Sequence, residues 1–280
     1  MILVGGLLIM FSCILIYWKS RYSPFKSQFN KRMQAYTTHY GDTNEMCTRE
    51  EIEKLPLALQ RYCNYIGLEN SPKYQVTNVF FKQTDFIFDD ESEKKLKMDY
   101  DLWLFKNTPI RSAYCTSGIY GIPFEGEDYC TDQKEGGMKG YLGKTIRLFD
   151  THDKQGYKAG LISWVIESAI FNPSALLSEH LSYKEIDDHH VQVCIQYEDI
   201  AGTGVFTIDD EGAIIEFYSD ERQVEKINGV DTMIGWRCES EDYVQQRMFR
   251  LPKVIRSIKV YPDKEVVYFE SDDYEIKYLK

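Results

Sequence analysis

The first 18 residues constrain this chain most, because the run MILVGGLLIMFSCILIYW contains no charged side chain. As a helix rising about 1.5 Å per residue, it would reach roughly 27 Å, close to the thickness of a bilayer core. Tyr17 and Trp18 end the run where aromatic side chains gather at a membrane interface, and Lys19 and Arg21 follow. The pattern predicts a transmembrane helix at residues 1–18. A cleaved signal peptide would instead have basic residues before the apolar run and a small-residue cleavage site after it.

The distribution of basic residues predicts which side of the membrane the rest of the chain occupies. Basic side chains follow the apolar run closely and none precedes it. The positive-inside rule therefore favours a cytoplasmic position for the soluble part over an extracytoplasmic one. Six cysteines after residue 18 and the lack of an N-x-[ST] sequon agree with that side. The sequence thus predicts a single-pass protein of the cell membrane.

Residues 19–47 are polar and partly basic, which indicates a juxtamembrane linker lying along the lipid head groups. A capping box at Thr48 and Glu51 predicts the start of a helix. A second helical stretch, LPLALQRYCNYI, is expected to end at Gly67. We predict that residues 48–280 form a single globular domain, because no segment rich in Pro, Gly or Ser divides them.

From residue 73 onward the apolar residues alternate with polar ones, which is typical of strands. Two shorter strands are expected around a turn at Gly136–Gly137. The exception to the alternation is YKAGLISWVIESAIF, residues 157–171, which predicts a helix ending before Asn172–Pro173. Hairpin turns recur without strand–helix–strand alternation, and 21 Tyr and 15 Phe favour sheet. We therefore predict an α+β fold, mainly antiparallel β, with a curved sheet or half-barrel wrapped on this central helix.

Several classes of function are disfavoured by composition and motifs. The net charge is −11 and the basic residues are scattered, so no nucleic-acid partner is expected. GGMKGYLGKT has the tail of a phosphate-binding loop, but Met138 stands where the first glycine belongs, and a strand-like TIRLFD follows. His189 and His190 are adjacent and would point to opposite faces of a strand, so a solvated turn is expected rather than a metal site. No cofactor, metal or catalytic residue is predicted.

The seven cysteines include no C-x-x-C pair of the kind found in zinc or redox sites. A chain of this size can bury a core without disulfides, so free and mostly buried thiols are expected. Cys115 and Cys130 are the exception, since a hairpin would let them face each other.

Glu167 is the charged residue that most needs explaining, because it interrupts the apolar surface of the 157–171 helix. A carboxylate in such surroundings must find a partner or change its pKa. Arg61, Arg111 and Arg222 are the candidate partners, and a structural ion pair is the expected outcome. Trp164 and the other aromatic residues either fill the core or line an apolar cavity.

Three segments resemble the landmarks of an uncharacterised bacterial family, a domain of unknown function that often follows an N-terminal membrane helix. They are LPLALQRYCNYIG, then YKAGLISWVIESAIFNPSALL followed by YKEID, and FTIDDEGAIIEFYSDER. The resemblance covers residues 55–280, with Tyr183 where a tryptophan is expected. It implies signature positions without a known role at Arg61-Tyr62, Glu167, Pro173, Asp187 and Arg222. The order of elements is also similar to the half-barrel of lipoprotein carriers.

These observations favour a membrane-anchored, non-enzymatic binding module for a lipid or other hydrophobic ligand. Its membrane partner would be the bilayer around residues 1–18. Trp164 and Phe171 are expected to line the pocket, and Glu167 with Arg222 to orient a head group. One alternative is a protein-interaction scaffold at the membrane that recruits an unknown partner through exposed strand edges. The other is an uncharacterised enzyme, for which no nucleophile or metal motif is present.

Overall fold

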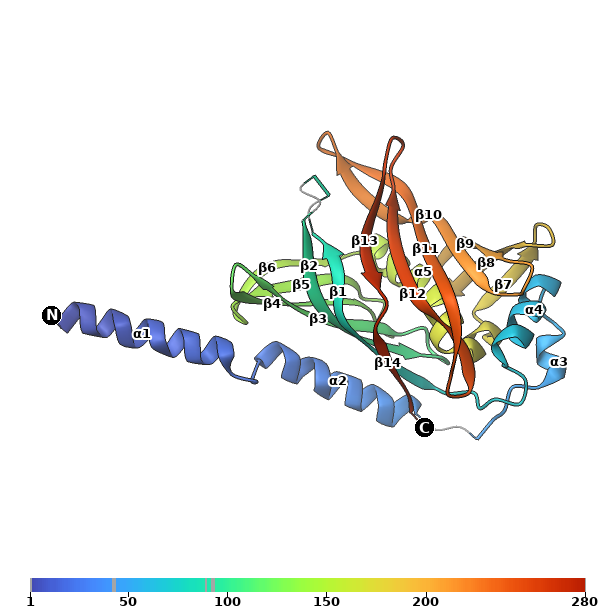
Figure 1. Ribbon diagram of the computed structural model, residues 1–280, viewed down its shortest axis with the longest axis horizontal. Coiled ribbons are helices and arrows are strands. Elements are labelled where there is room, and N and C mark those ends of the chain that lie inside the picture. Colours follow the sequence, from blue (N-terminus) through green and yellow to red (C-terminus); the bar gives the residue numbers. More distant parts are fainter. Residues whose placement is uncertain (1, 42–43, 89, 92–93, 280) are drawn as a thin grey trace.

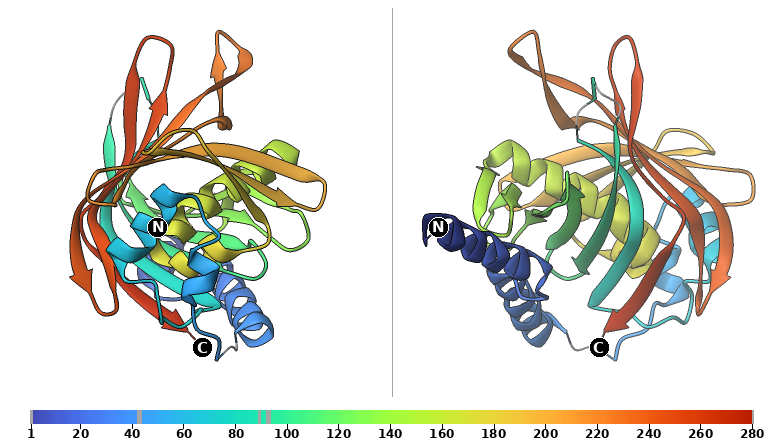
Figure 2. Two further views of the ribbon diagram at one scale, coloured as in Figure 1. Left: turned by 90° about the vertical axis from the view of Figure 1, so that its right-hand side faces the viewer. Right: turned by 60° about the vertical axis from the view of Figure 1, so that its left-hand side comes forward.

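The computed structural model describes residues 2–41, 44–88, 90–91 and 94–279. A large antiparallel sheet curls into a half-barrel around one long helix, and an apolar N-terminal helix projects away from it (Figures 1 and 2). The predicted α+β architecture, with a curved sheet wrapped on a central helix, is confirmed.

The helices are α1 (Ile2–Lys19), α2 (Pro24–Tyr40), α3 (Arg49–Ile52), α4 (Leu57–Ile66), α5 (Lys154–Phe171) and the 3₁₀ helix η1 (Pro173–Leu177). The first six strands are β1 (Val76–Ile87), β2 (Lys95–Phe105), β3 (Arg111–Ile119), β4 (Ile122–Cys130), β5 (Gly136–Leu142) and β6 (Ile146–His152). The others are β7 (Leu181–Glu185), β8 (His190–Tyr197), β9 (Ile200–Ile208), β10 (Ile214–Ile227), β11 (Val230–Gln246), β12 (Phe249–Val260), β13 (Glu265–Ser271) and β14 (Tyr274–Leu279).

Two meanders make up the sheet, whose strand order is β6-β5-β4-β3-β2-β1-β13-β12-β11-β10-β9-β8-β7, with β14 also paired to β1. The meanders join where β1 pairs antiparallel with β13, at Asp85 opposite Glu270. Helix α5 connects β6 to β7, the two outermost strands of this order, and lies inside the curl (Figure 2). The sheet can therefore bury its concave face against a helix of its own chain.

The expected turn at Gly136–Gly137 is wrong, because these residues begin β5 instead. Gly136 pairs with Cys130 of β4, so the chain reverses over residues 131–135, where Thr131 N donates to Glu135 O at 2.8 Å. A further hairpin turn follows β5 at Gly143 and Lys144, which both have positive φ angles. Residues 122–152 thus form three strands, and the GKT segment lies in a hairpin turn rather than at a helix N-terminus.

Helix α5 confirms the predicted central helix and begins three residues earlier than expected. Asp153 is its N-cap, with the side chain accepting a hydrogen bond from Gly156 N at 2.6 Å. The helix ends at Phe171, before Asn172 and Pro173, as the proline requires. Twelve of its 18 residues are buried, so the sheet covers it on most sides.

Small residues allow α5 to lie against β4 and β5. A Cβ atom on Gly136 would come within 2.4 Å of Tyr157 Cα, and one on Gly160 within 2.6 Å of Cys130 Cβ. Both contacts are shorter than packed atoms allow, and the first is with backbone that cannot move aside without shifting α5.

We expect Gly136→Ala to lower the free energy of unfolding by about 1–3 kcal/mol, the usual effect of overpacking. Gly118→Ala is the matched control, because Gly118 also lies in a strand and a Cβ there would meet nothing within 4 Å. Thermal or denaturant unfolding of the two variants measures the difference. Equal stability of the two variants would contradict this account of the contact.

The two helices α1 and α2 precede the sheet. Helix α1 is long and apolar enough to cross a membrane, and its described side chains are largely exposed. Residues 19–47, expected to be a linker, contain α2, which begins with Ser23 as N-cap and Pro24 in its first turn. Phe29 and Met33 of α2 are buried against a second apolar cluster that includes Tyr114.

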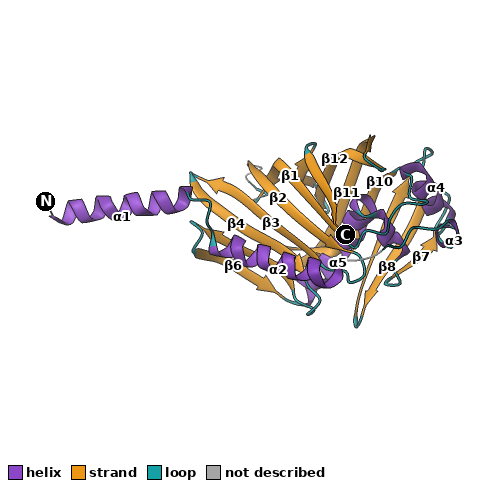
Figure 3. Ribbon diagram, turned by 90° about the horizontal axis from the view of Figure 1, so that it is seen from below, coloured by secondary structure: helices purple, strands orange, loops and turns teal. Residues whose placement is uncertain are grey.

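Helix α2 packs on the convex face of the sheet, across β3 to β5 (Figure 3). Two buried carboxylates of β4 hold it there: Glu125 accepts a hydrogen bond from Ser23 Oγ at 2.6 Å, and Glu127 forms an ion pair with Arg32. This segment is thus folded onto the half-barrel over much of its length.

Candidate functional site

A cavity of about 400 Å³ lies between α5 and the concave face of the sheet. Its wall is mostly apolar and aromatic and comes from β1, β2, α5, β12 and β13. Six residues represent this wall: Phe81, Phe86, Met98, Phe171, Ile255 and Phe269. Phe88 and Met138 also line the cavity and are partly exposed, so they lie at its opening. The space suits an apolar ligand, because most of the surface it offers cannot form hydrogen bonds.

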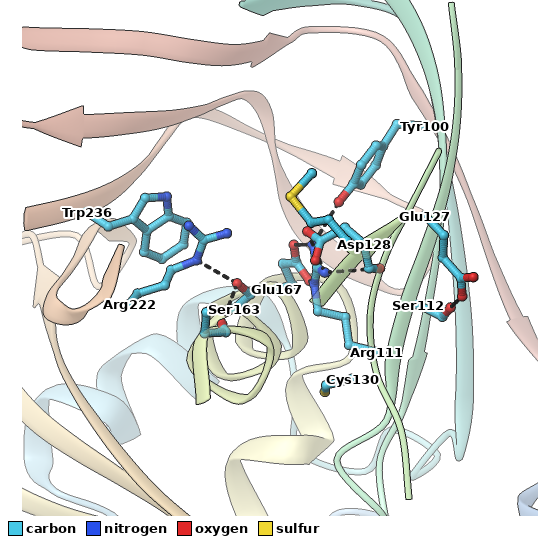
Figure 4. A network of polar contacts seen from close by, with 12 residues as sticks. Tyr100, Arg111, Ser112, Glu127, Asp128, Cys130, Ser163, Glu167, Arg222 and Trp236 are labelled. Atoms are coloured by element: carbon cyan, nitrogen blue, oxygen red, sulfur yellow. Dashed lines mark hydrogen bonds and ion pairs between the residues drawn. The ribbon is translucent and has the colours of Figure 1, made fainter. Parts of the chain in front are cut away.

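A charged cluster around Arg111 lies in one part of the cavity wall (Figure 4). Arg111 binds Glu167 through two hydrogen bonds, Nε to Oε2 at 2.5 Å and Nη2 to Oε1 at 2.9 Å. Its Nη1 lies 2.8 Å from Asp128 Oδ2, and its Nη2 also donates to Tyr100 Oη at 2.7 Å. The Arg111 side chain is only 2% exposed, so these partners are needed to offset the free-energy cost of burying its charge.

Strand alternation places these partners together. Arg111 on β3 and Asp128 on β4 both face α5, while Tyr114 and Glu127 on the same strands face α2. Burial raises the pKa of Glu167 above its usual range, although the nearby Arg111 guanidinium opposes that rise. Burial opposes the charged form of Arg111, but the carboxylates of Asp128 and Glu167 hold the pKa of this guanidinium well above its usual range. The cluster contains two carboxyl groups, those of Glu167 and Asp128, and one guanidinium, that of Arg111.

Arg222 of β10 provides a second guanidinium at the cavity, on the other side of α5 from Arg111 (Figure 4). It lies 4.0 Å from the centre of the Trp236 ring, and its Nε donates to Ser163 Oγ at 2.7 Å. Nη1 donates to Gln223 Oε1 at 2.8 Å. Within the described part of the chain no carboxylate forms an ion pair with Arg222, and its Nη2 group has no hydrogen-bond partner. A cationic hydrogen-bond donor is thus available beside an apolar space.

A model of a family of unknown function, DUF6544, matches residues 45–271, more than half of the chain. The chain belongs to this family. The DUF6544 match starts after α1 and α2 and includes the residues that line the cavity. The resemblance noted from the sequence is confirmed.

No protein of curated function matches the sequence. Among solved structures, the chain is similar to a LolA superfamily protein from Nitrosomonas europaea, with 10% sequence identity and a TM-score of 0.41. That alignment covers 84% of this chain and 94% of the other chain.

Three of the four residues predicted for the site line the cavity of the DUF6544 domain: Glu167, Phe171 and Arg222. Trp164 does not. Its side chain is fully buried in the main core and its Nε1 donates to Phe105 O at 2.8 Å. The position of Trp164 on the helix places its ring toward the sheet strands beside Phe105 rather than toward the cavity.

Of the three predicted partners of Glu167, Arg111 is the one that binds it. Arg61 instead donates from Nη2 to the main-chain oxygen of Asp188 at 2.5 Å. Sequence reasoning missed Asp128 and Tyr100, which complete the cluster. The strand pattern could have identified Asp128 as part of the cluster. Arg111 and Asp128 both interrupt runs of apolar residues on the strand faces that alternation assigns to the core.

Other sequence candidates lie outside this site. Cys115 and Cys130 do not face each other, since Cys115 pairs with Gly126 and Cys130 with Arg111 across the β3–β4 hairpin. Asp187 Oδ1 accepts hydrogen bonds from the main-chain N–H groups of His189 and His190, as in an ordinary turn. Among the described residues, no three His, Cys, Asp or Glu side chains are grouped as metal ligands.

Proposed function

We propose that this chain is a membrane-anchored, non-enzymatic binding protein for a lipid or other hydrophobic ligand with an anionic head group. The observation that carries the proposal is the combination of an apolar cavity of about 400 Å³ with Arg222, a guanidinium that lacks an acidic partner in the described structure. An acyl chain would lie along the aromatic wall. Its carboxylate or phosphate would bind the free N–H groups of Arg222.

The Arg111 cluster has a structural role in this proposal. Arg111 engages both Glu167 and Asp128, so neither carboxylate is free to act as a general base. Their excess negative charge is balanced across α5 by Arg222. Glu167 interacts with Arg222 electrostatically without forming an ion pair, and its negative charge limits how strongly an anion binds.

Helix α1 would cross the membrane and keep the binding domain beside its lipid source. Its exposed apolar surface supports this role, and Lys19 and Arg21 after it favour a cytoplasmic domain. A tether of this kind raises the local concentration of a membrane-derived ligand without any additional contact.

Photo-crosslinking of the full chain tests the proposed binding site. The chain is reconstituted in nanodiscs that contain a fatty acid with a diazirine near its terminal methyl group, and crosslinked peptides are mapped by mass spectrometry. We expect modification of β2 and β12, at or near Met98 and Ile255. Crosslinks confined to α1 would show that the lipid contacts only the membrane helix and would refute binding in the cavity.

Glu167 predicts a pH dependence of ligand affinity. Because burial raises its pKa, acidification protonates Glu167 before an ordinary glutamate, and Arg222 then lacks its compensating negative charge. Affinity for an anion should therefore increase as the pH falls, by roughly threefold or more, and the increase should begin at a higher pH than the titration of an ordinary glutamate. Anilinonaphthalene sulfonate is a suitable probe, because its sulfonate stays ionised throughout.

The variant Glu167→Gln separates this effect from the titration of other groups. In that variant the affinity should be nearly independent of pH and close to the low-pH value of the parent. Circular dichroism establishes that the variant is folded. An unchanged pH slope in Glu167→Gln would exclude Glu167 as the titrating group.

A further inference from the structure

Hydrogen bonds from Lys144 attach the last turn of α1 to the half-barrel. This side chain lies in the β5–β6 turn, is 7% exposed, and donates from Nζ to one main-chain oxygen in the last turn of α1 and to two just after it. The acceptors are Tyr17 O at 3.2 Å, Ser20 O at 2.6 Å and Tyr22 O at 3.1 Å. Carbonyls at a helix C-terminus lack partners within the helix and carry partial negative charge, so a lysine there both caps the helix and neutralises it.

A second contact supports this attachment. Gly143 lies against the Trp18 indole, and a Cβ at Gly143 would be 3.0 Å from Trp18 Nε1. Beyond the junction, α2 is held on the sheet by Ser23 and by the contact of Phe25 with Tyr141, whose rings are tilted by 45° with centroids 4.7 Å apart. The chain between α1 and α2 is therefore bound to the sheet and does not form a free tether.

The turn that holds α1 lies beside the tip of the β3–β4 hairpin. Gly143 N donates to Pro123 O at 2.7 Å, which places the two hairpin tips together at one end of the sheet, next to the end of α1 (Figure 1). Large side chains are exposed there: Tyr120 is 89% exposed, Tyr22 62% and Ile146 61%. We call these three residues the tip surface.

We infer that the tip surface rests on the bilayer that α1 crosses, so that the half-barrel docks on the membrane in one fixed orientation. The inference depends on the proposed membrane span of α1. If Tyr17 and Trp18 lie at the membrane interface, the hydrogen bonds from Lys144 to the end of α1 hold the tip surface at the same depth. Tyrosine and isoleucine side chains are suited to that position, and Lys94 lies 4.6 Å from the Tyr120 ring centre, where a cation can meet lipid phosphates.

Docking in this orientation would aid ligand transfer. Met138 of β5 and Phe88 lie at the opening of the cavity, and β5 also carries the turn that holds α1. A half-barrel on a flexible tether would sample many orientations. The attachment of α1 through Lys144 instead keeps one end of the cavity-forming strands at the lipid surface. The head-group region would then be within reach of the cavity without release of the protein.

Depth-dependent fluorescence quenching of the full chain in liposomes tests this inference. A nitrobenzoxadiazole label is attached to Tyr120→Cys or Ile146→Cys in a background with Cys13→Ala and Cys194→Ala, and nitroxide is carried on lipid head groups. Ile186→Cys is the matched control, because Ile186 is also apolar and exposed but lies near β7, at the far end of the molecule (Figure 1). We expect quenching by about half or more at 120 and 146, since interfacial residues lie within about 5–10 Å of the head-group boundary, and little at 186.

Adding Lys144→Met should reduce quenching at 120 without changing it at 186, because it removes three hydrogen bonds that attach the end of α1 to the half-barrel. Equal, weak quenching at 120 and 186 in a chain that resists alkaline carbonate extraction would overturn the docking while leaving the membrane span intact. A label at 120 that is shielded from both lipid nitroxide and aqueous iodide would also overturn it, by showing that protein covers the tip surface. Extraction of the chain by carbonate would instead contradict the membrane span in the proposed function.

Discussion

Replacement of Arg111 by methionine is expected to lower the free energy of unfolding by about 3–5 kcal/mol, the effect of breaking a buried ion pair from one side. The guanidinium is 2% exposed and binds Glu167 and Asp128. Without it, two carboxylates remain close together in a largely apolar wall. Denaturant unfolding of a fragment spanning residues 22–280, which keeps α2 and all fourteen strands, measures the loss.

Two further variants show whether the loss comes from unpaired charge. Adding Glu167→Gln to Arg111→Met should restore part of the stability, because it removes one of the two stranded carboxylates. Arg237→Met is the control, since Arg237 forms ion pairs with Glu265 and Glu239 but is more exposed. Its effect should be about 1 kcal/mol or less, as for surface pairs. Similar losses for Arg111→Met and Arg237→Met would contradict a special role for the buried cluster.

Replacement of Arg222 by methionine is expected to weaken binding of a long-chain fatty acid by about tenfold to a hundredfold. A charge-assisted hydrogen bond contributes about 1.5–3 kcal/mol, and each 1.4 kcal/mol changes affinity about tenfold. The same substitution should leave binding of the corresponding fatty alcohol nearly unchanged, because the alcohol carries no charge for Arg222 to bind. Competition against a fluorescent fatty acid measures both affinities.

Arg250→Met is a closely matched control for Arg222→Met. Arg250 also stacks on an aromatic ring, with its guanidinium carbon 4.4 Å from the centre of Tyr65, but it does not line the cavity. We expect no change in affinity for either ligand. If Arg222→Met weakened acid and alcohol equally, Arg222 would support the wall rather than bind the head group.

The sequence was sufficient to predict the central helix and the antiparallel sheet, because both depend on local periodicity. Asp153 and Pro173 mark the limits of α5 clearly, and the capping box of Thr48 and Glu51 is present as expected. The need of Glu167 for an arginine followed from the cost of burying a charge. Which arginine it would be depended on strand pairing, which one sequence does not reveal.

Helix α2 was missed because its polar composition resembled that of a linker. Its sequence nevertheless contained the signal: Ser23 before Pro24 is a good helix start, and Phe25, Phe29 and Met33 recur every four residues. The shape of the cavity could not be predicted from the sequence, for a different reason. Trp164 and Phe171 share the helix, but only the position of the sheet decides that Phe171 meets open space and Trp164 a strand.

The measurement that tests the binding proposal most directly is native mass spectrometry of the fragment of residues 22–280, prepared without detergent. It is incubated with vesicles of membrane lipids, separated from them and analysed together with its lipid extract. We predict a bound species at one-to-one stoichiometry whose mass matches an extracted acidic lipid, with much less of it in Arg222→Met. A fragment that stays at its own mass after incubation, while folded by circular dichroism, would contradict the account.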